Sequence, residues 1–349
     1  MSQLPIILAC ILIFYYVIWR FFIIFWNNSK IIPIIIAVLI TIITMWTFMY
    51  QWNSKYLDMI WTFSTRILVS WFLLMIILLI ESIISTRYKI NPRIIVWFII
   101  VFFWLWAYFS LHTKITNLNI QSDKIHKDAK ILLVSDIHVE NLTSTFNLNK
   151  IKKTIESEKP DFVIIAWDLM NKPNNYYVDY FSVLKSIKDT PIFAVIWNHD
   201  VMGNSSIVKD IPKNSDIIFL NNAVTKNDSL NIQIAGIIDK SIWYKSLDEI
   251  MDELDFDNSK DWFTILVTHQ PIWLEKLENY PVDLEVAWHT HRGQFFWIME
   301  LSRLANDYLY WEYKYWDRTA FVTQWIWTWW LPFRLWTQSE MVLINLKKK

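Results

Sequence analysis

Glycine is almost absent from this chain, although tight turns and close backbone approaches depend on it. The 349 residues include 3 glycines and 23 tryptophans. Average usage predicts about two dozen glycines for a chain of this length, and the two counts together come close to that expectation. We hypothesise that the gene comes from a lineage that reads UGA as glycine, so that many tryptophans of the printed sequence are glycines in the living protein.

The positions of the tryptophans support this hypothesis more than their number does. Three of them stand directly before polar groups, in the segments Ala166-Trp167-Asp168, Ile196-Trp197-Asn198-His199-Asp200 and Ala287-Trp288-His289-Thr290-His291. A residue at such a strand-to-loop turn often needs a positive φ, which glycine adopts at no steric cost. A tryptophan there would bury about 150–250 Å² and displace its neighbours. If these tryptophans are genuine, a damaged, catalytically inactive domain is the alternative.

Apolar residues are concentrated in the first third of the chain. The whole sequence is 54% hydrophobic. Four stretches approach the roughly 20 apolar residues that cross a bilayer, namely Leu4–Trp26, Ile31–Tyr50, Ile67–Ile84 and Ile94–Ser110. We therefore predict about four transmembrane helices and a multi-pass protein of the cell membrane. Basic residues flank both sides of the predicted spans equally, so the positive-inside rule does not decide on which side the remaining domain lies. Arg20, near the end of the first stretch, is expected to be an interfacial anchor.

The rest of the chain has the pattern of a globular domain. We assign residues 1–112 to the membrane region, 113–129 to a linker and 130–349 to the globular domain. Short apolar runs alternate there with polar segments of helical spacing, which predicts an α/β domain whose helices cover packed sheets. The predicted strands are Ile131–Ser135, Phe162–Ala166, Ile192–Ile196, Ile217–Leu220, Ile232–Ile238, Phe263–Thr268 and Leu284–Ala287. The predicted helices are Leu148–Glu158 and Tyr177–Lys188.

Side chains that bind metals follow the predicted strands, in the loops where α/β domains place their sites. Five of the 7 histidines lie there. The residues are Asp136, His138, Asp168, Asn198, His199, His269, His289 and His291. Their oxygen and imidazole groups suit Mn, Fe, Zn and related divalent ions. The set is too large for one ion and fits two ions that share a bridging carboxylate, an arrangement that clamps a phosphate and generates a hydroxide nucleophile.

These segments resemble, in order, the motifs D-x-H, G-D, G-N-H-D/E, a lone H and G-H-x-H of the calcineurin-like metallophosphoesterase family. The resemblance covers about Lys130–Leu346. It implies a layered αββα sandwich and a metal-dependent phosphatase that hydrolyses a phosphate ester or pyrophosphate with metal-activated hydroxide. Each G of these motifs is a tryptophan in this chain, as the recoding hypothesis requires.

The resemblance also implies a role for each donor. One ion would bind Asp136, His138 and His291, a second would bind Asn198, His269 and His289, and Asp168 would bridge the two. His199 would stabilise the transition state or protonate the leaving oxygen, with Asp200 to orient it. Gly293 would belong to the loop that closes the site. Glu140 stands where relatives often have a small residue, and it would tune metal affinity or substrate charge.

The segment Val322–Trp336 resembles the V-S-x-G-x-G-x-x-G-L-P-x-R-x-G stretch of membrane-linked bacterial members of the family. Its glycine positions hold Trp325, Trp327, Trp330 and Trp336, while Trp329 falls on a variable position. Trp311 and Trp316 are further candidates for glycine, in the preceding hairpin. A tryptophan-rich surface that binds sugars or membranes is the alternative interpretation of this segment.

The resemblance also suggests a substrate class. Similar membrane-linked members include enzymes that cleave the pyrophosphate of UDP-2,3-diacylglucosamine, so a lipid-linked phosphate or pyrophosphate is the leading substrate class. Arg292 and Arg334 are candidate contacts to its phosphate oxygens.

Other functions were weighed against this one. An inactive, membrane-anchored scaffold or sensor is the second hypothesis, and the codons distinguish the two, since UGG at positions 167, 197 and 288 would indicate lost activity. A transporter is disfavoured because no pattern of charges marks a substrate path within the predicted helices. The net charge of +0 gives no reason to expect nucleic acid. The oligomeric state stays open.

Overall fold

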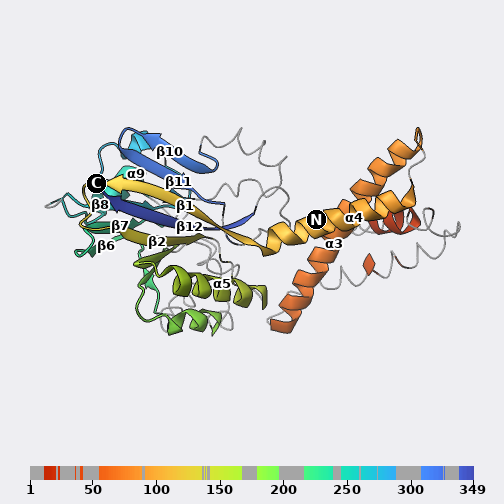
Figure 1. Ribbon diagram of the computed structural model, residues 1–349, viewed down its shortest axis with the longest axis horizontal. Coiled ribbons are helices and arrows are strands. Elements are labelled where there is room, and N and C mark those ends of the chain that lie inside the picture. Colours follow the sequence, from red (N-terminus) through yellow and green to blue (C-terminus); the bar gives the residue numbers. More distant parts are fainter. Residues whose placement is uncertain are drawn as a thin grey trace. The chain divides into compact units, whose positions relative to one another are not determined.

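The computed structural model describes residues 12–20, 23, 36, 40–41, 55–88, 91–135, 137, 139, 142–166, 179–195, 216–238, 245–258, 261–272, 274–287, 308–324, 326 and 338–349. The chain divides into two compact units (Figure 1). The helical unit comprises Met1–Tyr108 and Trp330–Pro332, and the sheet unit comprises Phe109–Trp329 and Phe333–Lys349.

The helical unit contains the long helix α3 (Lys55–Ser85) and, up to Tyr108, the helix α4 (Pro92–Leu111). Some of its apolar side chains bury one another, in one cluster around Phe14 and Ile18 and a second around Val17, Leu78 and Ile95. An ion pair between Arg20 and Glu81, 2.8 Å long, accompanies this packing. Arg20 also donates to the Ser85 hydroxyl at 3.0 Å. The guanidinium that we expected to be an interfacial anchor therefore has partners within the chain.

The prediction of a multi-pass membrane protein was wrong. In the part of the chain that the structure describes, no helix combines the length and the apolar character that a bilayer crossing requires. The prediction counted apolar residues along the sequence. It took no account of the clusters in which these residues pack against each other, or of the ion pair between Arg20 and Glu81.

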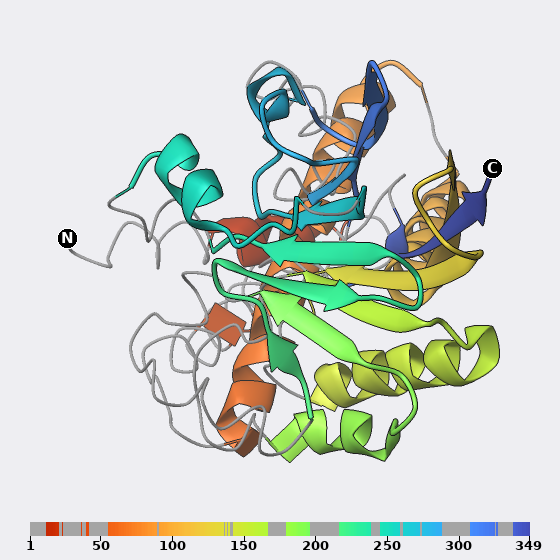
Figure 2. The same cartoon turned by 90° about the vertical axis from the view of Figure 1, so that its left-hand side faces the viewer.

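The sheet unit is built from two mixed sheets of six strands each (Figures 1 and 2). The first sheet has the order β1 (Thr113–Ser122), β12 (Ser339–Lys348), β2 (Ala129–Ser135), β3 (Phe162–Ala166), β4 (Ile192–Val195) and β5 (Ile218–Phe219). The second has the order β10 (Trp311–Tyr315), β11 (Arg318–Val322), β9 (Leu284–Ala287), β8 (Phe263–Val267), β7 (Ile232–Gly236) and β6 (Ala223–Asn227). Strands β2 to β5 are parallel, and so are β7, β8, β9 and β11.

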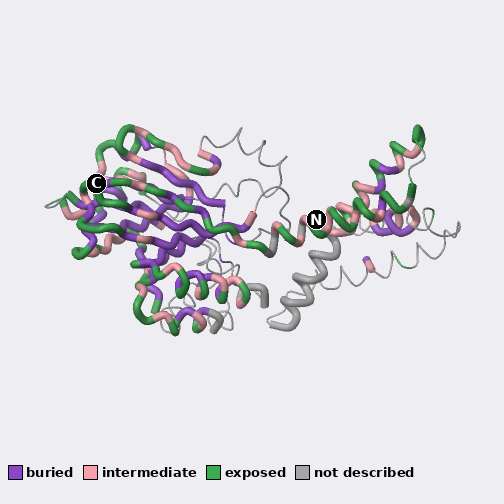
Figure 3. The backbone as a smooth tube through the Cα atoms, in the orientation of Figure 1, coloured by how far each residue is buried: buried purple, intermediate pink, exposed green. Residues whose placement is uncertain are grey.

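Alternating side chains divide the interior into three apolar layers, because successive residues of a strand point to opposite faces of the sheet. In β2, Ile131 and Leu133 pack between the sheets, whereas Leu132 and Val134 pack on the outer face against α5 (Leu142–Glu158) and η1 (Asp179–Ser186). The outer face of the second sheet is covered by α9 (Leu247–Glu253) and η4 (Leu274–Leu277). The buried segments in Figure 3 follow these layers. The predicted layered α/β architecture is confirmed.

The predicted strands occur within two residues of their expected ends, but β1, β6, β10, β11 and β12 are not among them, and α5 begins before the predicted helix Leu148–Glu158. The segment assigned to a linker begins with β1, which pairs in parallel with β12. Its largely polar side chains, half of them exposed, conceal it as a strand, because it lies at the edge of the first sheet. The helix predicted at Tyr177–Lys188 is the 3₁₀ helix η1 where it is described.

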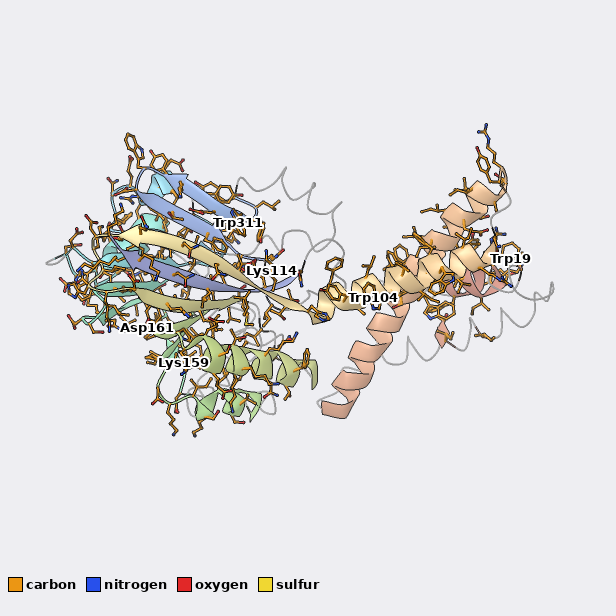
Figure 4. All side chains as sticks on the ribbon, in the orientation of Figure 1. Trp19, Trp104, Lys114, Lys159, Asp161 and Trp311 are labelled. Atoms are coloured by element: carbon orange, nitrogen blue, oxygen red, sulfur yellow. The ribbon has the colours of Figure 1, made fainter. Side chains whose placement is uncertain are left out.

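Two tryptophans have backbone angles that tryptophan rarely adopts. Trp311 has φ 87° and Trp316 has φ 55°, in the left-handed region where Cβ collides with the backbone. Trp316 and Asp317 form the two-residue turn between β10 and β11, whose ends pair Tyr315 with Arg318. A turn with a positive φ at its first central residue alone is the type that favours glycine there. The ring of Trp311 lies 5.9 Å from the Lys114 ammonium (Figure 4).

Gly236 lies where no side chain fits, at the end of β7. A Cβ atom on this residue would lie 2.4 Å from the Leu220 carbonyl oxygen and 2.8 Å from a Val195 methyl group. We expect Gly236→Ala to lower the free energy of unfolding by about 1 to 3 kcal/mol through overpacking, measured by urea denaturation. Ser229→Thr, which adds one methyl group at an exposed turn, is the control. Equal stability of the two variants would contradict the close packing at Gly236.

The hairpin turn offers a test of whether glycine suits the backbone at Trp316. Because this side chain is 86% exposed, its removal loses little packing. We expect Trp316→Gly to be more stable than Trp316→Ala by about 1 kcal/mol, since both lose the indole and only glycine relieves the left-handed strain. Urea denaturation of the two variants measures the difference. An alanine variant as stable as the glycine variant would show that the turn does not select glycine.

Candidate functional site

The parallel strands of the first sheet end in one row. Ser135, Ala166 and Val195 are register partners across β2, β3 and β4. Because neighbouring strands lie about 4.8 Å apart, the chain leaves these strands at points within about 10 Å of one another. In the sequence, the predicted donors follow these points by one, two and three residues, as Asp136, Asp168 and Asn198.

The second sheet ends in a similar way. Beyond β8, the Thr268 N–H donates to the Val286 carbonyl at 3.1 Å, and beyond β11 the Thr323 N–H donates to the Ala287 carbonyl at 2.9 Å. His269 comes directly after Thr268 and is only 3% exposed. The predicted ligand His289 follows Ala287 by two residues. The ends of β8 and β9 therefore lie side by side and form a second row of strand ends.

The segment after β11 joins the two rows. The Ile326 N–H donates to the Ser135 carbonyl at 3.2 Å, directly before the predicted ligand Asp136. The Ile326 side chain is buried in the outer core of the first sheet. This single segment thus runs from the end of the second sheet to the end of β2, and it brings both sets of strand ends to one edge of the sandwich.

Glu340 of β12 holds the start of this segment. Its buried carboxylate accepts hydrogen bonds from the Thr323 hydroxyl at 3.1 Å and the Gln324 N–H at 3.2 Å. It also accepts hydrogen bonds from the hydroxyl groups of Tyr310, at 3.0 Å, and of Thr116. Several donors around one carboxylate compensate for the cost of burying it, so Glu340 fixes the path that leads to Ile326.

His269 is the one predicted site residue within the described part of the chain. The others lie outside it: Asp136, His138, Asp168, Asn198, His199, Asp200, His289, His291, Arg292 and Arg334. The same holds for Glu140, Gly293 and the tryptophans of the predicted glycine motifs, Trp311 and Trp316 excepted. Among the described residues, no group of three or more His, Cys, Asp or Glu side chains could hold a metal ion. The described residues therefore show where the strands end, and the donor types that follow these ends in the sequence suit divalent ions.

Glu285 is a buried acid near His269 that the sequence analysis missed. It lies on β9, is fully buried, and its Oε1 accepts hydrogen bonds from the Ile272 N–H at 2.6 Å and the Thr268 hydroxyl at 2.8 Å. The signal in the sequence was a single carboxylate inside the otherwise apolar strand Leu284-Glu285-Val286-Ala287.

Burial alters the titration of the Glu285 carboxyl. Burial raises the pKa of this carboxyl from 4.5 to about 8. The hydrogen bonds from Ile272 and Thr268 lower the pKa, but burial has the larger effect. The unfolded chain releases this proton near pH 4.5 and the folded chain retains it up to about pH 8. Glu285 therefore makes the folded state less stable as the pH rises through this window.

Comparison with known proteins agrees with the motifs and the strand ends. Residues 129–293 match the family model described as calcineurin-like phosphoesterase. An uncharacterized metallophosphoesterase of Helicobacter pylori is 28% identical over 257 residues, which cover 71% of this chain and 68% of the relative. One of Campylobacter jejuni is 28% identical over 246 residues, covering 68% and 64%. One of Aquifex aeolicus is 26% identical over 264 residues, covering 70% and 97%.

The chain spans about two thirds of the length of the Helicobacter and Campylobacter relatives. The family to which these relatives are assigned generally uses divalent metal ions and hydrolyses phosphoesters. The matched region, 129–293, begins at β2 and includes the ends of β3, β4, β8 and β9. The family match and the relatives together support the assignment of this chain to the calcineurin-like metallophosphoesterase family.

Proposed function

We propose that this chain hydrolyses phosphate esters or pyrophosphates at a centre of two divalent metal ions. The observation that carries the proposal is the convergence of strand ends at one edge of the sandwich. Ser135, Ala166 and Val195 end in one row, and the Ile326–Ser135 hydrogen bond ties this row to the end of the second sheet. Five predicted donor segments begin within three residues of these ends.

The proposed donors and their neighbours have different roles at this edge of the sandwich. Asp136, His138, Asp168, Asn198, His269, His289 and His291 would hold the ions, with Asp168 between them. When bound, the ions would supply Lewis-acid activation of the phosphate and a hydroxide nucleophile. His199, oriented by Asp200, would stabilise the charge on the reacting phosphate or donate a proton to the leaving oxygen. Arg292 and Arg334 would bind phosphate oxygens through their planar guanidinium groups.

The lipid-linked substrate expected from the sequence is not carried forward. That expectation depended on the resemblance to membrane-linked members of the family together with the predicted membrane helices, and the structure does not support those helices. The phosphate chemistry does not depend on them, because it depends on the donor set that follows the strands. The proposal therefore concerns phosphate esters and pyrophosphates as a class.

We also propose that Trp167, Trp197, Trp288, Trp311, Trp316, Trp325, Trp327, Trp330 and Trp336 are glycines in the living protein. The support comes from the two of them that are described, since Trp311 and Trp316 both have left-handed φ angles. Trp19 and Trp104, by contrast, lie in helices (Figure 4) and have no left-handed φ. The backbone thus distinguishes tryptophans at proposed glycine positions from tryptophans elsewhere.

The first test uses the full-length chain with glycine at these nine positions, which we call the glycine form. We expect it to bind two Mn²⁺ ions in titration calorimetry and to hydrolyse bis-p-nitrophenyl phosphate. His269→Ala should lose one of the two ions and most of the activity, because each ion depends on few protein ligands. His126→Ala, at an exposed turn remote from these strand ends, should behave like the parent. A glycine form that binds no Mn²⁺ would refute the proposed function.

A second variant separates catalysis from metal binding. We expect His199→Ala in the glycine form to bind Mn²⁺ as the parent does and to lose a factor of about 100 or more in turnover, the usual contribution of a positioned acid or base. Steady-state kinetics with bis-p-nitrophenyl phosphate, together with calorimetry, measure both effects. Unchanged turnover would contradict the proposed role of His199.

A further inference from the structure

A carboxyl group interrupts an apolar row in the second sheet. Ala235, Leu266, Glu285 and Ala320 are register partners across β7, β8, β9 and β11. The three apolar members belong to the core between this sheet and the segments α9 and η4. An apolar side chain at position 285 would complete that layer, and burying a carboxyl there carries a cost in stability.

The two residues that donate hydrogen bonds to Glu285 lie on either side of His269 in the sequence. One donor, the Thr268 hydroxyl, belongs to the residue directly before His269, and the other, the Ile272 N–H, lies three residues after it. Pro271 has no N–H, so Ile272 offers the first backbone donor after Gln270. A single oxygen atom, Oε1 of Glu285, therefore holds both ends of the loop 268–272.

We propose that Glu285 is a positioning residue that holds the loop 268–272 so that His269 is preorganised as a metal ligand. The inference rests on the proposed function, because it takes His269 as a ligand. Groups that hydrogen-bond a metal ligand and orient it typically contribute about 10- to 100-fold to metal affinity, and Glu285 would act on His269 through the two ends of its loop.

The same sheet provides a matched control. Gln233 on β7 is also buried, and its amide group donates to the Thr264 hydroxyl at 2.8 Å and accepts from the Asp257 N–H at 3.2 Å. Like Glu285, it connects a threonine hydroxyl to a backbone N–H. Its partners Thr264 and Asp257 lie outside the loop 268–272, so its loss should affect stability without affecting the metal centre.

The experiment compares Glu285→Leu with Gln233→Leu in the full-length glycine form. We expect the Mn²⁺ dissociation constant of Glu285→Leu to rise about 10-fold or more, and that of Gln233→Leu to stay at the parental value. In the metal-free protein, hydrogen exchange should increase in residues 268–272 for Glu285→Leu alone. Thermal unfolding of both variants shows whether each is folded.

Two milder variants keep the inference testable if Glu285→Leu does not fold. Glu285→Gln retains an oxygen that accepts both hydrogen bonds, and it should keep parental Mn²⁺ affinity. Thr268→Val removes one of the two bonds and should weaken binding, whereas Thr264→Val should not.

The outcomes distinguish this inference from the proposed function. A parent that binds no Mn²⁺ overturns the proposed function, and with it the role of Glu285. Normal binding by the parent, with equal affinities in the Glu285 and Gln233 variants and unchanged exchange at 268–272, overturns the role of Glu285 alone.

Discussion

The packing of two six-stranded sheets face to face is the constraint on which the rest of the sheet unit depends. Alternate residues of the strands are buried between the sheets, among them Leu133, Ile164, Ile265 and Val286. Burial of this apolar surface is the dominant favourable contribution to folding, and it aligns the strands of the two layers. Because most strands within each sheet are parallel, their ends lie together. The location of the candidate site at one edge of the sandwich follows from this packing before any metal-binding side chain is considered.

The sequence predicted elements that a local apolar pattern marks. It missed elements that are stabilised by partners far away in the chain. The run Phe162–Ala166 is apolar throughout, Leu284–Ala287 is apolar except for Glu285, and both occur as strands with the predicted bounds. The edge strand β1 is largely polar, and only its pairing with β12, more than 200 positions away in the chain, makes it a strand. For the site, the order of motifs predicted which strand ends would converge. It did not predict Glu285 or Glu340, because their importance comes from partners elsewhere in the chain, such as Thr268 after β8 and Thr323 after β11.

The recoding hypothesis gains a physical argument that composition could not give. A surplus of tryptophan matches a deficit of glycine in number, but a count does not locate any residue. The left-handed backbone at Trp311 and Trp316 marks two positions where the fold requires a positive φ, which glycine adopts without strain. Among the described residues, the other non-glycine residues with this backbone are Lys159, Asp216, Asn222 and Asn231, and all but Lys159 are of types that tolerate it. Tryptophan is not among them, so the fold and the printed side chains disagree at these two places.

The two edges of the sandwich stabilise buried polar groups by different means. At the edge where β8 and β9 begin, Lys124 pairs with Asp283 at 2.8 Å and with Asp261 at 3.3 Å. Toward the edge where these strands end, Glu285 lies within β9, is fully buried and accepts hydrogen bonds from the neutral Thr268 hydroxyl and Ile272 N–H. An ion pair at the latter edge would place a competing positive charge near the proposed cations. The role proposed for Glu285 needs an acceptor oxygen and no counter-charge, so neutral donors suit this place better than a salt bridge.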